Sequence, residues 1–270
     1  MPISKALTDI VGTGGDGLGS FNISSMAALV AAACGVPIAK HGNRAVSSKS
    51  GSADFYEALG IKIDLPAEKT AGIIEKTDFG FLYAPVYHSA MRFAAPVRKL
   101  LGVKTIMNLV GPLSNPAGAQ YQMLGVYDKA LMRPVAEASK MLGSKRVMVI
   151  SSDDGLDEIS PAALTSVIEI GEDGASREYA IDPADFGITG SSTDELLGGD
   201  AAENARLALA MLDGKGRPGI RAAVALNAAA TLYISGAAAT MQEGYKRSLE
   251  AIADGSVARK IAAVREASRA

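Results

Sequence analysis

The residues best suited to chemistry lie near the start of the chain, in a glycine-rich loop at residues 12–17 and a basic segment at residues 40–44. Glycine lets backbone N–H groups approach phosphate oxygens closely, and it adopts positive φ angles without steric cost. Lys40 and Arg44 add positive charge beside such a loop. Together the two segments predict a pocket for an anion that carries several phosphates. Taken separately, a flexible turn and a solvated basic loop are the alternatives.

The glycine-rich loop follows neither of two familiar nucleotide-binding patterns. Its glycines lack the G-x-G-x-x-G spacing of dinucleotide-binding proteins, and no Gly-Lys-Ser/Thr follows them as in a P-loop. The next segment favours the start of a helix with Asn22 or Ser24 as its N-terminal cap, and the free N–H groups there attract anions. Asp16 would repel phosphate, so it fits better as a hydrogen-bond acceptor for a sugar hydroxyl or a substrate amine.

A cluster of acidic residues lies much further along the chain, where Asp153, Asp154, Asp157 and Glu158 follow an expected strand. Carboxylate oxygens on a loop suit Mg²⁺, which usually takes one or two carboxylates together with water and phosphate. From the residues alone, the cluster indicates either a metal site or a solvated acidic turn.

These segments need elements that bring them together, and the hydrophobic pattern alternates between strand-like and helix-like runs. The alternation predicts an α/β fold with a mostly parallel central sheet flanked by helices. Ligands bind at the carboxyl ends of such strands, so the glycine loop and the basic segment should converge there. We expect strands at 8–11, 36–39, 79–83, 121–126, 146–151 and 164–170, and helices at 22–33, 52–59, 67–76, 85–101, 131–142, 201–212, 219–236 and 240–253.

The composition is that of an ordinary globular protein, with 270 residues, 48% of them hydrophobic, and a net charge of −2. We expect one α/β domain over residues 1–270, with no nucleic-acid and no membrane partner. The first residues lack the apolar core of a secretory signal, which favours a cytoplasmic location. The apolar stretch 222–239 is mostly alanine and is interpreted as a buried helix. From Thr193 onward the chain is predicted to be helical scaffold without chemistry.

Several further motifs complete an ordered set with the two loops: His88 followed by Arg98, Gly-Pro-Leu-Ser-Asn-Pro-Ala at 111–117, and Gly-Leu-Asp-Glu at 155–158. From about residue 9 to the C-terminus, this set closely resembles anthranilate phosphoribosyltransferase, a tryptophan-pathway family with the nucleoside-phosphorylase-type phosphoribosyltransferase fold. The resemblance implies transfer of a phosphoribosyl group from 5-phosphoribosyl 1-pyrophosphate (PRPP) to the amine of anthranilate, with release of pyrophosphate. It also implies Mg²⁺ as cofactor and a homodimer.

The resemblance assigns roles to individual residues. Asp157 and Glu158 would bind magnesium with Ser24, and the backbone of residues 12–15 would hold pyrophosphate. Arg98 would pair with the anthranilate carboxylate, for which a planar guanidinium is well matched. No general base is assigned, and His88 either orients anthranilate or is a packing or capping residue. Substrate contacts are implied for Gly12, Gly15, Asp16, Ser20, Asn22, Ile23, Ser24, Ser25, Lys40, His41, Gly42, Asn43, Arg44, Ala45, Val46, Ser47, Ser48, Ser52 and Arg98.

The chain also departs from the pattern of the family. Members carry a block of helices before the glycine loop, whereas only eleven residues precede Gly12 here. We therefore expect a form that lacks most of this segment, with residues 85–117 contributing to a truncated helical subdomain and a weakened dimer. Ser20 and Ser25 stand where threonine is expected, and both keep the hydroxyl. A pyrimidine nucleoside phosphorylase and a non-catalytic nucleotide-sensing protein of the same fold are the alternative functions.

Overall fold

The computed structural model describes residues 3–14, 17–45, 48–90, 93 and 106–270. Within them, a seven-stranded sheet has the order β3-β2-β1-β4-β5-β6-β7. The first five strands in that order are parallel, and β6 and β7 are antiparallel to their neighbours. The mostly parallel α/β sheet predicted from the sequence is thereby confirmed. The strands are β1 Thr8–Gly12, β2 Ile38–Gly42, β3 Phe79–Tyr83, β4 Tyr121–Gly125, β5 Arg146–Ser152, β6 Thr165–Ile170 and β7 Ser176–Ile181.

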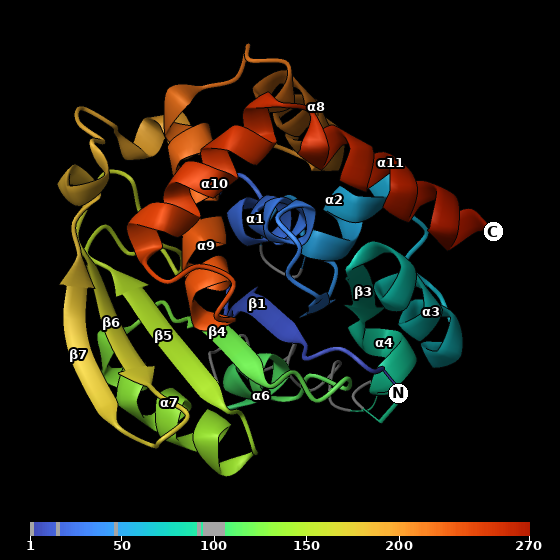
Figure 1. The fold of residues 1–270 in the computed structure, drawn as a ribbon, viewed down its shortest axis with the longest axis horizontal. Coiled ribbons are helices and arrows are strands. Elements are labelled where there is room, and N and C mark those ends of the chain that lie inside the picture. The colour runs from blue at the N-terminus through green and yellow to red at the C-terminus, as the bar shows by residue number, and fades with distance from the viewer. Residues whose placement is uncertain (1–2, 15–16, 46–47, 91–92, 94–105) are drawn as a thin grey trace.

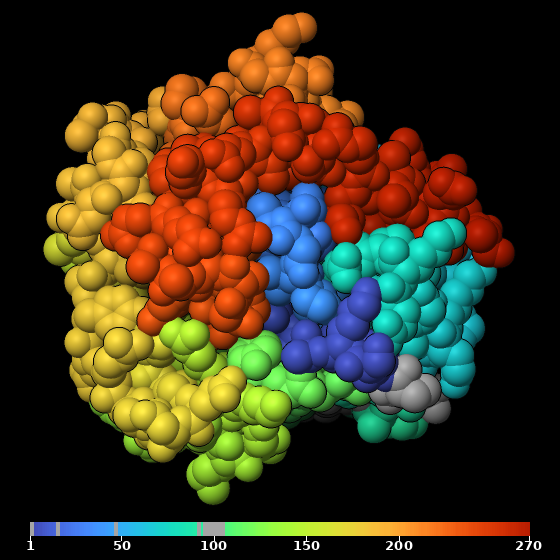
Figure 2. All heavy atoms as spheres, viewed as in Figure 1, coloured from blue at the N-terminus to red at the C-terminus, as the bar shows by residue number. Residues whose placement is uncertain are grey.

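Helices cover both faces of this sheet (Figure 1). On one face α1 packs against β1 and β2 and α9 packs against β4 and β5, while α7 packs on β5 and β6 from the other. The helices are α1 Ile23–Ala33, α2 Ser52–Ala58, α3 Ala67–Thr77, α4 Ala84–Tyr87, α6 Met107–Leu113, α7 Met132–Met141, α8 Ala201–Leu212, α9 Pro218–Ile234, α10 Met241–Ala253 and α11 Ser256–Arg269. In the space-filling view, the orange and red C-terminal helices cover the upper part of the molecule (Figure 2).

The main hydrophobic core lies around α1 and α9. Both helices are buried on nearly all sides, as expected for helices whose residues are apolar all round. Helix α10 approaches α9 closely because Gly244 has no side chain: a Cβ there would lie 2.8 Å from the carbonyl oxygen of Ala229. The buried helix expected within 222–239 is confirmed. Among the described residues, no helix has the length and apolar character needed to cross a bilayer.

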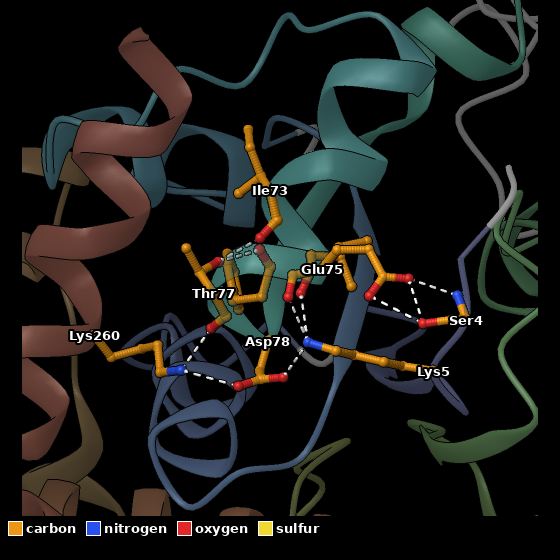
Figure 3. A network of polar contacts seen from close by, with 9 residues as sticks. Ser4, Lys5, Ile73, Glu75, Thr77, Asp78 and Lys260 are labelled. Carbon is orange, nitrogen blue, oxygen red and sulfur yellow. Dashed lines mark hydrogen bonds and ion pairs between the residues drawn. The ribbon is translucent and has the colours of Figure 1, made fainter.

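Two lysines from distant parts of the sequence close the C-terminal end of α3 (Figure 3). The Lys5 ammonium donates to the carbonyl oxygen of Glu75 (2.6 Å) and pairs with Asp78 (2.8 Å), and Lys260 donates to the carbonyl oxygen of Thr77 (2.5 Å). Cations at this end of a helix satisfy its free carbonyl groups and the negative end of its dipole. The junction fixes the segment before β1 and helix α11 against α3.

The difference from expectation that matters most for function lies in β2. We expected this strand to end before the basic segment, but it continues through Lys40 and His41 to Gly42. The two residues pair in register with Phe81 and Leu82 of β3, and both side chains are buried. The reason is tertiary, because β2 lies between two parallel neighbours whose backbones extend its ladder. Lys40 and His41 are therefore strand residues.

The helix predicted at 85–101 differs as well. Helix α4 ends at Tyr87, and His88 leaves the helical conformation with ψ +57°. Residues 91–92 and 94–105 lie outside the described part of the chain, so most of that prediction and the subdomain at 85–117 stay untested. Strand β7 was missed because its side chains are mostly exposed and show no hydrophobic alternation. Helix α6 was missed too, and α11 lies in the stretch after Thr193 that was expected to be helical but was not given bounds of its own.

Candidate active site

The glycine loop and the acidic loop meet at the carboxyl ends of β1 and β5. The Gly14 N–H donates to Asp157 Oδ2 at 2.6 Å. The Ser24 N–H, at the start of α1, donates to Glu158 Oε1 at 3.1 Å. Both contacts join residues more than 130 positions apart in the sequence. The acidic loop, which follows β5, therefore lies at the same edge of the sheet as the glycine loop and the start of α1.

Two glycines make room for the acidic loop. Gly12 and Gly125 are register partners at the ends of β1 and β4. A Cβ on Gly12 would clash with the Asp157 carboxylate, and one on Gly125 would clash with the Asp157 backbone. Glycine at position 12 is thus needed for Asp157 to reach the glycine loop. The sequence analysis had considered glycine there as a means for phosphate to approach the backbone. The sequence analysis did not single out Gly125.

The Asp157–Glu158 pair is buried, with 7% and 8% of these residues exposed. Burial raises the pKa of Glu158 to about 8, and the neighbouring Asp157 charge adds to that rise. Lys40 and hydrogen bonds from Ser24 lower this pKa but do not cancel the rise. The protein surroundings therefore disfavour the charged form of Glu158, and a cation bound beside the pair would favour that form again.

Lys40 lies inside the sheet, at 2% exposure, rather than on a phosphate-binding loop. Its ammonium donates to the Ile10 carbonyl oxygen at 2.6 Å. Burial lowers the pKa of Lys40, while the charges of Asp9, Glu158 and Asp157 raise it. This ammonium is thus the buried countercharge of the carboxylates. That placement corrects the expectation that Lys40 lies on a segment that follows the strand.

Asp9 is a buried residue of this network that the sequence analysis missed. Its carboxylate accepts hydrogen bonds from Asn115 Nδ2 (2.7 Å) and from the His41 N–H (3.2 Å). Asn115 also donates to the Ala39 carbonyl oxygen at 2.8 Å. Burial raises the pKa of Asp9 to about 6, although Lys40 lowers it. Through Asp9, the motif at 111–117 is tied to β1 and β2.

His41 and His88 form a close pair of rings, with centroids 5.0 Å apart. Burial, followed by the proximity of His88, lowers the pKa of His41 to about 4. Nδ1 of His41 is 3.1 Å from the Gly111 carbonyl oxygen. Among the described residues, Nε2 of each ring is buried without a hydrogen-bond partner. His41 is therefore a neutral, buried imidazole, and its Nε2 has no hydrogen-bond partner among the described residues.

Arg44 is an exposed cation at the rim. It pairs with Asp54 (2.9 Å) and Glu57 (2.5 Å), and its guanidinium lies 5.6 Å from the centre of the Tyr83 ring. The Asp54 carboxylate also accepts the N–H groups of Ala45 and Gly51. Asp54 therefore organises the segment between β2 and α2, and Arg44 already has two carboxylate partners.

The cap predicted for α1 is corrected by the structure. Asn22 occupies the N-cap position, but neither its side chain nor that of Ser24 caps the helix. Instead Asn22 Nδ2 donates to the Ser50 carbonyl oxygen (3.1 Å), and Asn22 Oδ1 accepts from the Ser50 hydroxyl and from Asn204 Nδ2 (2.7 Å). Asn204 lies on α8, in the segment expected to be scaffold only. It was missed because no local motif marks it.

The remaining predicted residues divide into three groups. Ile23 and Ser25 are buried, and the Ser25 carbonyl oxygen accepts the Tyr56 hydroxyl. Ser20, Gly42, Asn43, Ala45, Ser48 and Ser52 border the two loops. Gly15, Asp16, Val46, Ser47 and Arg98 lie outside the described residues.

The other two acids of the cluster have structural roles. Asp154 accepts the Ser160 hydroxyl at 2.6 Å and so closes the acidic loop, whereas Asp153 pairs with Lys129 at the surface. Within the described residues, no three or more His, Cys, Asp or Glu side chains form a metal-binding group. Two carboxylates with additional ligands from substrate or water are nevertheless a usual set for Mg²⁺. The residues present fit that ion.

Known proteins resemble the chain over nearly its whole length. Residues 4–258 match the protein family described as "Glycosyl transferase family, a/b domain". Anthranilate phosphoribosyltransferase from Myxococcus xanthus is 45% identical over 265 residues, which cover 98% of this chain and 78% of that protein. The solved structure of the Thermus thermophilus enzyme of that name is 43% identical, with a TM-score of 0.93 over 99% of this chain and 80% of its own. The Saccharomyces cerevisiae enzyme, in complex with PRPP and Mg, is 30% identical, with a TM-score of 0.90 and coverages of 98% and 74%.

Proposed function

Because the chain belongs to the anthranilate phosphoribosyltransferase family, we propose that it transfers the phosphoribosyl group of PRPP to anthranilate. The products are N-(5-phosphoribosyl)anthranilate and pyrophosphate, in a step of tryptophan biosynthesis. The observation that carries the proposal is the pair of contacts from Gly14 to Asp157 and from Ser24 to Glu158. They bring an anion-binding loop, a helix N-terminus and a buried carboxylate pair into one site.

The reaction needs a site that stabilises a leaving diphosphate. The bond between ribose C1 and the pyrophosphate oxygen breaks, and C1 bonds to the anthranilate nitrogen, which loses a proton. Positive charge grows on the ribose and negative charge on the leaving group. We place the leaving group at the N–H groups of the glycine loop and the N-terminus of α1, which stabilise growing negative charge. Asp157 and Glu158 accept N–H groups of Gly14 and Ser24 in this structure, so these carboxylates border the same place.

The charge balance of the site supports Mg²⁺ as its cofactor. Asp157 and Glu158 would hold the ion together with Ser24, and buried Lys40 offsets part of their negative charge. Bound there, Mg²⁺ supplies electrostatic stabilisation of the pyrophosphate oxygens. The yeast relative that holds PRPP and Mg is consistent with this assignment.

The anthranilate amine has to be oriented toward ribose C1, but it does not require a strong general base. The amine of anthranilate is already neutral at pH 7, and His41 is held neutral by burial. We place anthranilate near the His41–His88 pair, with Gly12, Asn43 and Arg98 in contact. His88 would then orient the ring. Substrate contacts from residues 40–48 and from Ser52 stay predictions, as do the homodimer and the cytoplasmic location.

The loss of anthranilate fluorescence on conversion tests the proposal directly. We expect the signal to fall only when PRPP and Mg²⁺ are both present. Phosphate-dependent cleavage of a nucleoside without loss of anthranilate would contradict the proposal and indicate a phosphorylase. Binding of PRPP without any turnover would contradict it in favour of a nucleotide sensor.

A further inference from the structure

Helix α9 carries a polar side chain in the middle of an apolar environment. Asn227 is completely buried, and its neighbours Leu226 and Ala228 are equally inaccessible. An amide group in such surroundings costs free energy unless its hydrogen-bonding groups are satisfied. The sequence analysis treated this alanine-rich segment as scaffold, and the proposed mechanism does not use it.

The Asn227 amide is satisfied by the loop that carries the carboxylate pair. Its Oδ1 accepts the N–H of Ile159 at 3.0 Å, and its Nδ2 donates to the carbonyl oxygen of the same residue at 2.9 Å. Nδ2 also donates to the Ala223 carbonyl oxygen, one turn earlier in α9, at 2.8 Å. One side chain therefore binds both polar backbone groups of Ile159 and is itself anchored to the helix.

Ile159 directly follows Glu158, so these bonds act on the backbone that holds the carboxylates. The Ile159 N–H belongs to the peptide group that joins it to Glu158. This stretch is buried yet has no helix or strand to satisfy its backbone. Other contacts hold the loop further along, where the Ser160 N–H donates to Thr165 Oγ1 at 3.2 Å. From α9, the Asn227 side chain contacts the residue directly after the carboxylate pair.

We propose that Asn227 is a positioning residue for Asp157 and Glu158, and this inference rests on the proposed function. The amide fixes the Glu158–Ile159 peptide and thereby holds both carboxylates against Gly14 and Ser24. Groups that orient metal ligands typically change metal affinity by about 10- to 100-fold when removed. Loss of Asn227 should weaken binding of the divalent ion and slow the reaction while leaving the anthranilate KM nearly unchanged.

The test compares two variants with a matched control in the same helix. Asn227→Ala removes all three hydrogen bonds. Asn227→Ser keeps a hydroxyl that can bond back to Ala223 but is too short to reach Ile159, so it should retain more stability. Thr231→Ala is the control, because Thr231 is equally buried and its hydroxyl donates to the Asn227 carbonyl oxygen (2.8 Å). For each protein we would measure Tm, the Kd of Mn²⁺ with pyrophosphate by electron paramagnetic resonance, and kcat and KM for both substrates.

We expect both Asn227 variants to bind Mn²⁺ about 10-fold more weakly than wild type, with kcat reduced to a similar degree. Thr231→Ala should lower Tm but keep the Mn²⁺ Kd within twofold. If a folded Asn227 variant matches Thr231→Ala in Mn²⁺ affinity and kcat, the inference is overturned and the asparagine is only structural. Hydrogen exchange on wild-type protein gives an independent check, since rapid exchange of the Ile159 N–H would also overturn it. A wild-type protein without transferase activity would instead contradict the proposed function.

Discussion

Glu158 and Glu169 are both buried, yet their surroundings move their pKa values in opposite directions. Glu169, on β6, has 1% of its surface exposed and accepts hydrogen bonds from Arg146 (2.7 and 3.0 Å), Arg177 (3.0 Å) and the Tyr179 hydroxyl (2.9 Å). Burial alone would raise the pKa of Glu169, but these bonds and the arginine charges outweigh it and hold the pKa below its ordinary value.

Among the residues that the structure describes, Glu158 has fewer donors and cations around it than Glu169 has. The Ser24 N–H donates to it, and Lys40 is the cation that lowers its pKa. The neighbouring Asp157 charge acts in the other direction. The fold thus surrounds Glu169 with enough donors and cations to keep a buried carboxylate charged. At Glu158 the protein groups do not outweigh burial, so a cation bound with the substrate would stabilise the charged form there.

Removing the carboxylate pair should have the largest effect. We expect Asp157→Asn combined with Glu158→Gln to reduce turnover by at least ~10²-fold, a loss typical of one missing charge-stabilising group. The anthranilate fluorescence assay measures it, with Glu169→Gln as the control that removes a buried carboxylate from the other region. Activity of the double variant close to that of the control would contradict the metal role.

Glu169 should show the reverse pattern, with stability lost and chemistry kept. Glu169→Ala leaves Arg146 and Arg177 without their shared partner; Arg177 is mostly exposed, so we expect a cost of about 2 kcal/mol rather than the full value for a buried pair. Urea unfolding measures the free energy. Glu178→Ala, whose exposed carboxylate on β7 pairs with Arg133 of α7, should cost less than about 0.5 kcal/mol. A large loss of kcat in folded Glu169→Ala would mean that the two regions are coupled.

The pH dependence of stability should separate the two glutamates. Glu158 has a pKa raised from 4.5 to about 8, so the folded state holds a proton that the unfolded state has lost. Stability contributed by this group is complete below pH 4.5 and falls as the pH rises toward 8, with a slope of at most about 1.4 kcal/mol per pH unit. Glu169 acts in the opposite sense, because its lowered pKa contributes stability that is lost only as the pH falls below its ordinary value.

The informative window is pH 6.5 to 8, because Asp9 and His41 titrate below it, with pKa values near 6 and 4. Urea unfolding without divalent ions should show stability falling across this window. Glu158→Gln should flatten the dependence, and so should added Mg²⁺ with pyrophosphate. An unchanged slope in Glu158→Gln would show that another group causes it.

The sequence predicted the fold well where the hydrophobic pattern is regular. The parallel strands and the buried helices α1 and α9 follow from apolar runs of the right length and spacing. Strand β7 is an exposed edge that shows no such pattern, and β2 continues through Lys40 because it pairs with parallel strands on both sides. The latter depends on tertiary contacts that a single sequence does not display.

In the candidate site, residues within local motifs could be predicted from the sequence. The residues that hold them in place from distant segments could not. The convergence of Gly14 and Ser24 with the acidic pair followed from loops that each succeed a strand. Asp9, Asn204 and Asn227 carry no motif of their own, and each acts on a residue that lies far away in the sequence. Arg146 likewise has no motif and reaches Glu169 from another strand. Their roles depend on which elements pack together, so they become visible only in three dimensions.

Substitution of Arg44 should have the smallest effect of the changes considered, and it tests whether an ion-paired group at the site also binds substrate. It is a cation that already has two carboxylate partners, Asp54 and Glu57, at the rim of the site. Because the group is exposed, we expect Arg44→Ala to change the free energy of unfolding by less than about 1 kcal/mol. If the guanidinium turns from these partners to the phosphoribosyl group, KM for PRPP should rise several-fold while KM for anthranilate stays constant. Glu57→Gln is the control, since it frees the guanidinium from one partner and should lower KM for PRPP slightly. Unchanged KM values in both variants would show that Arg44, like Glu169, has a structural role and does not bind PRPP.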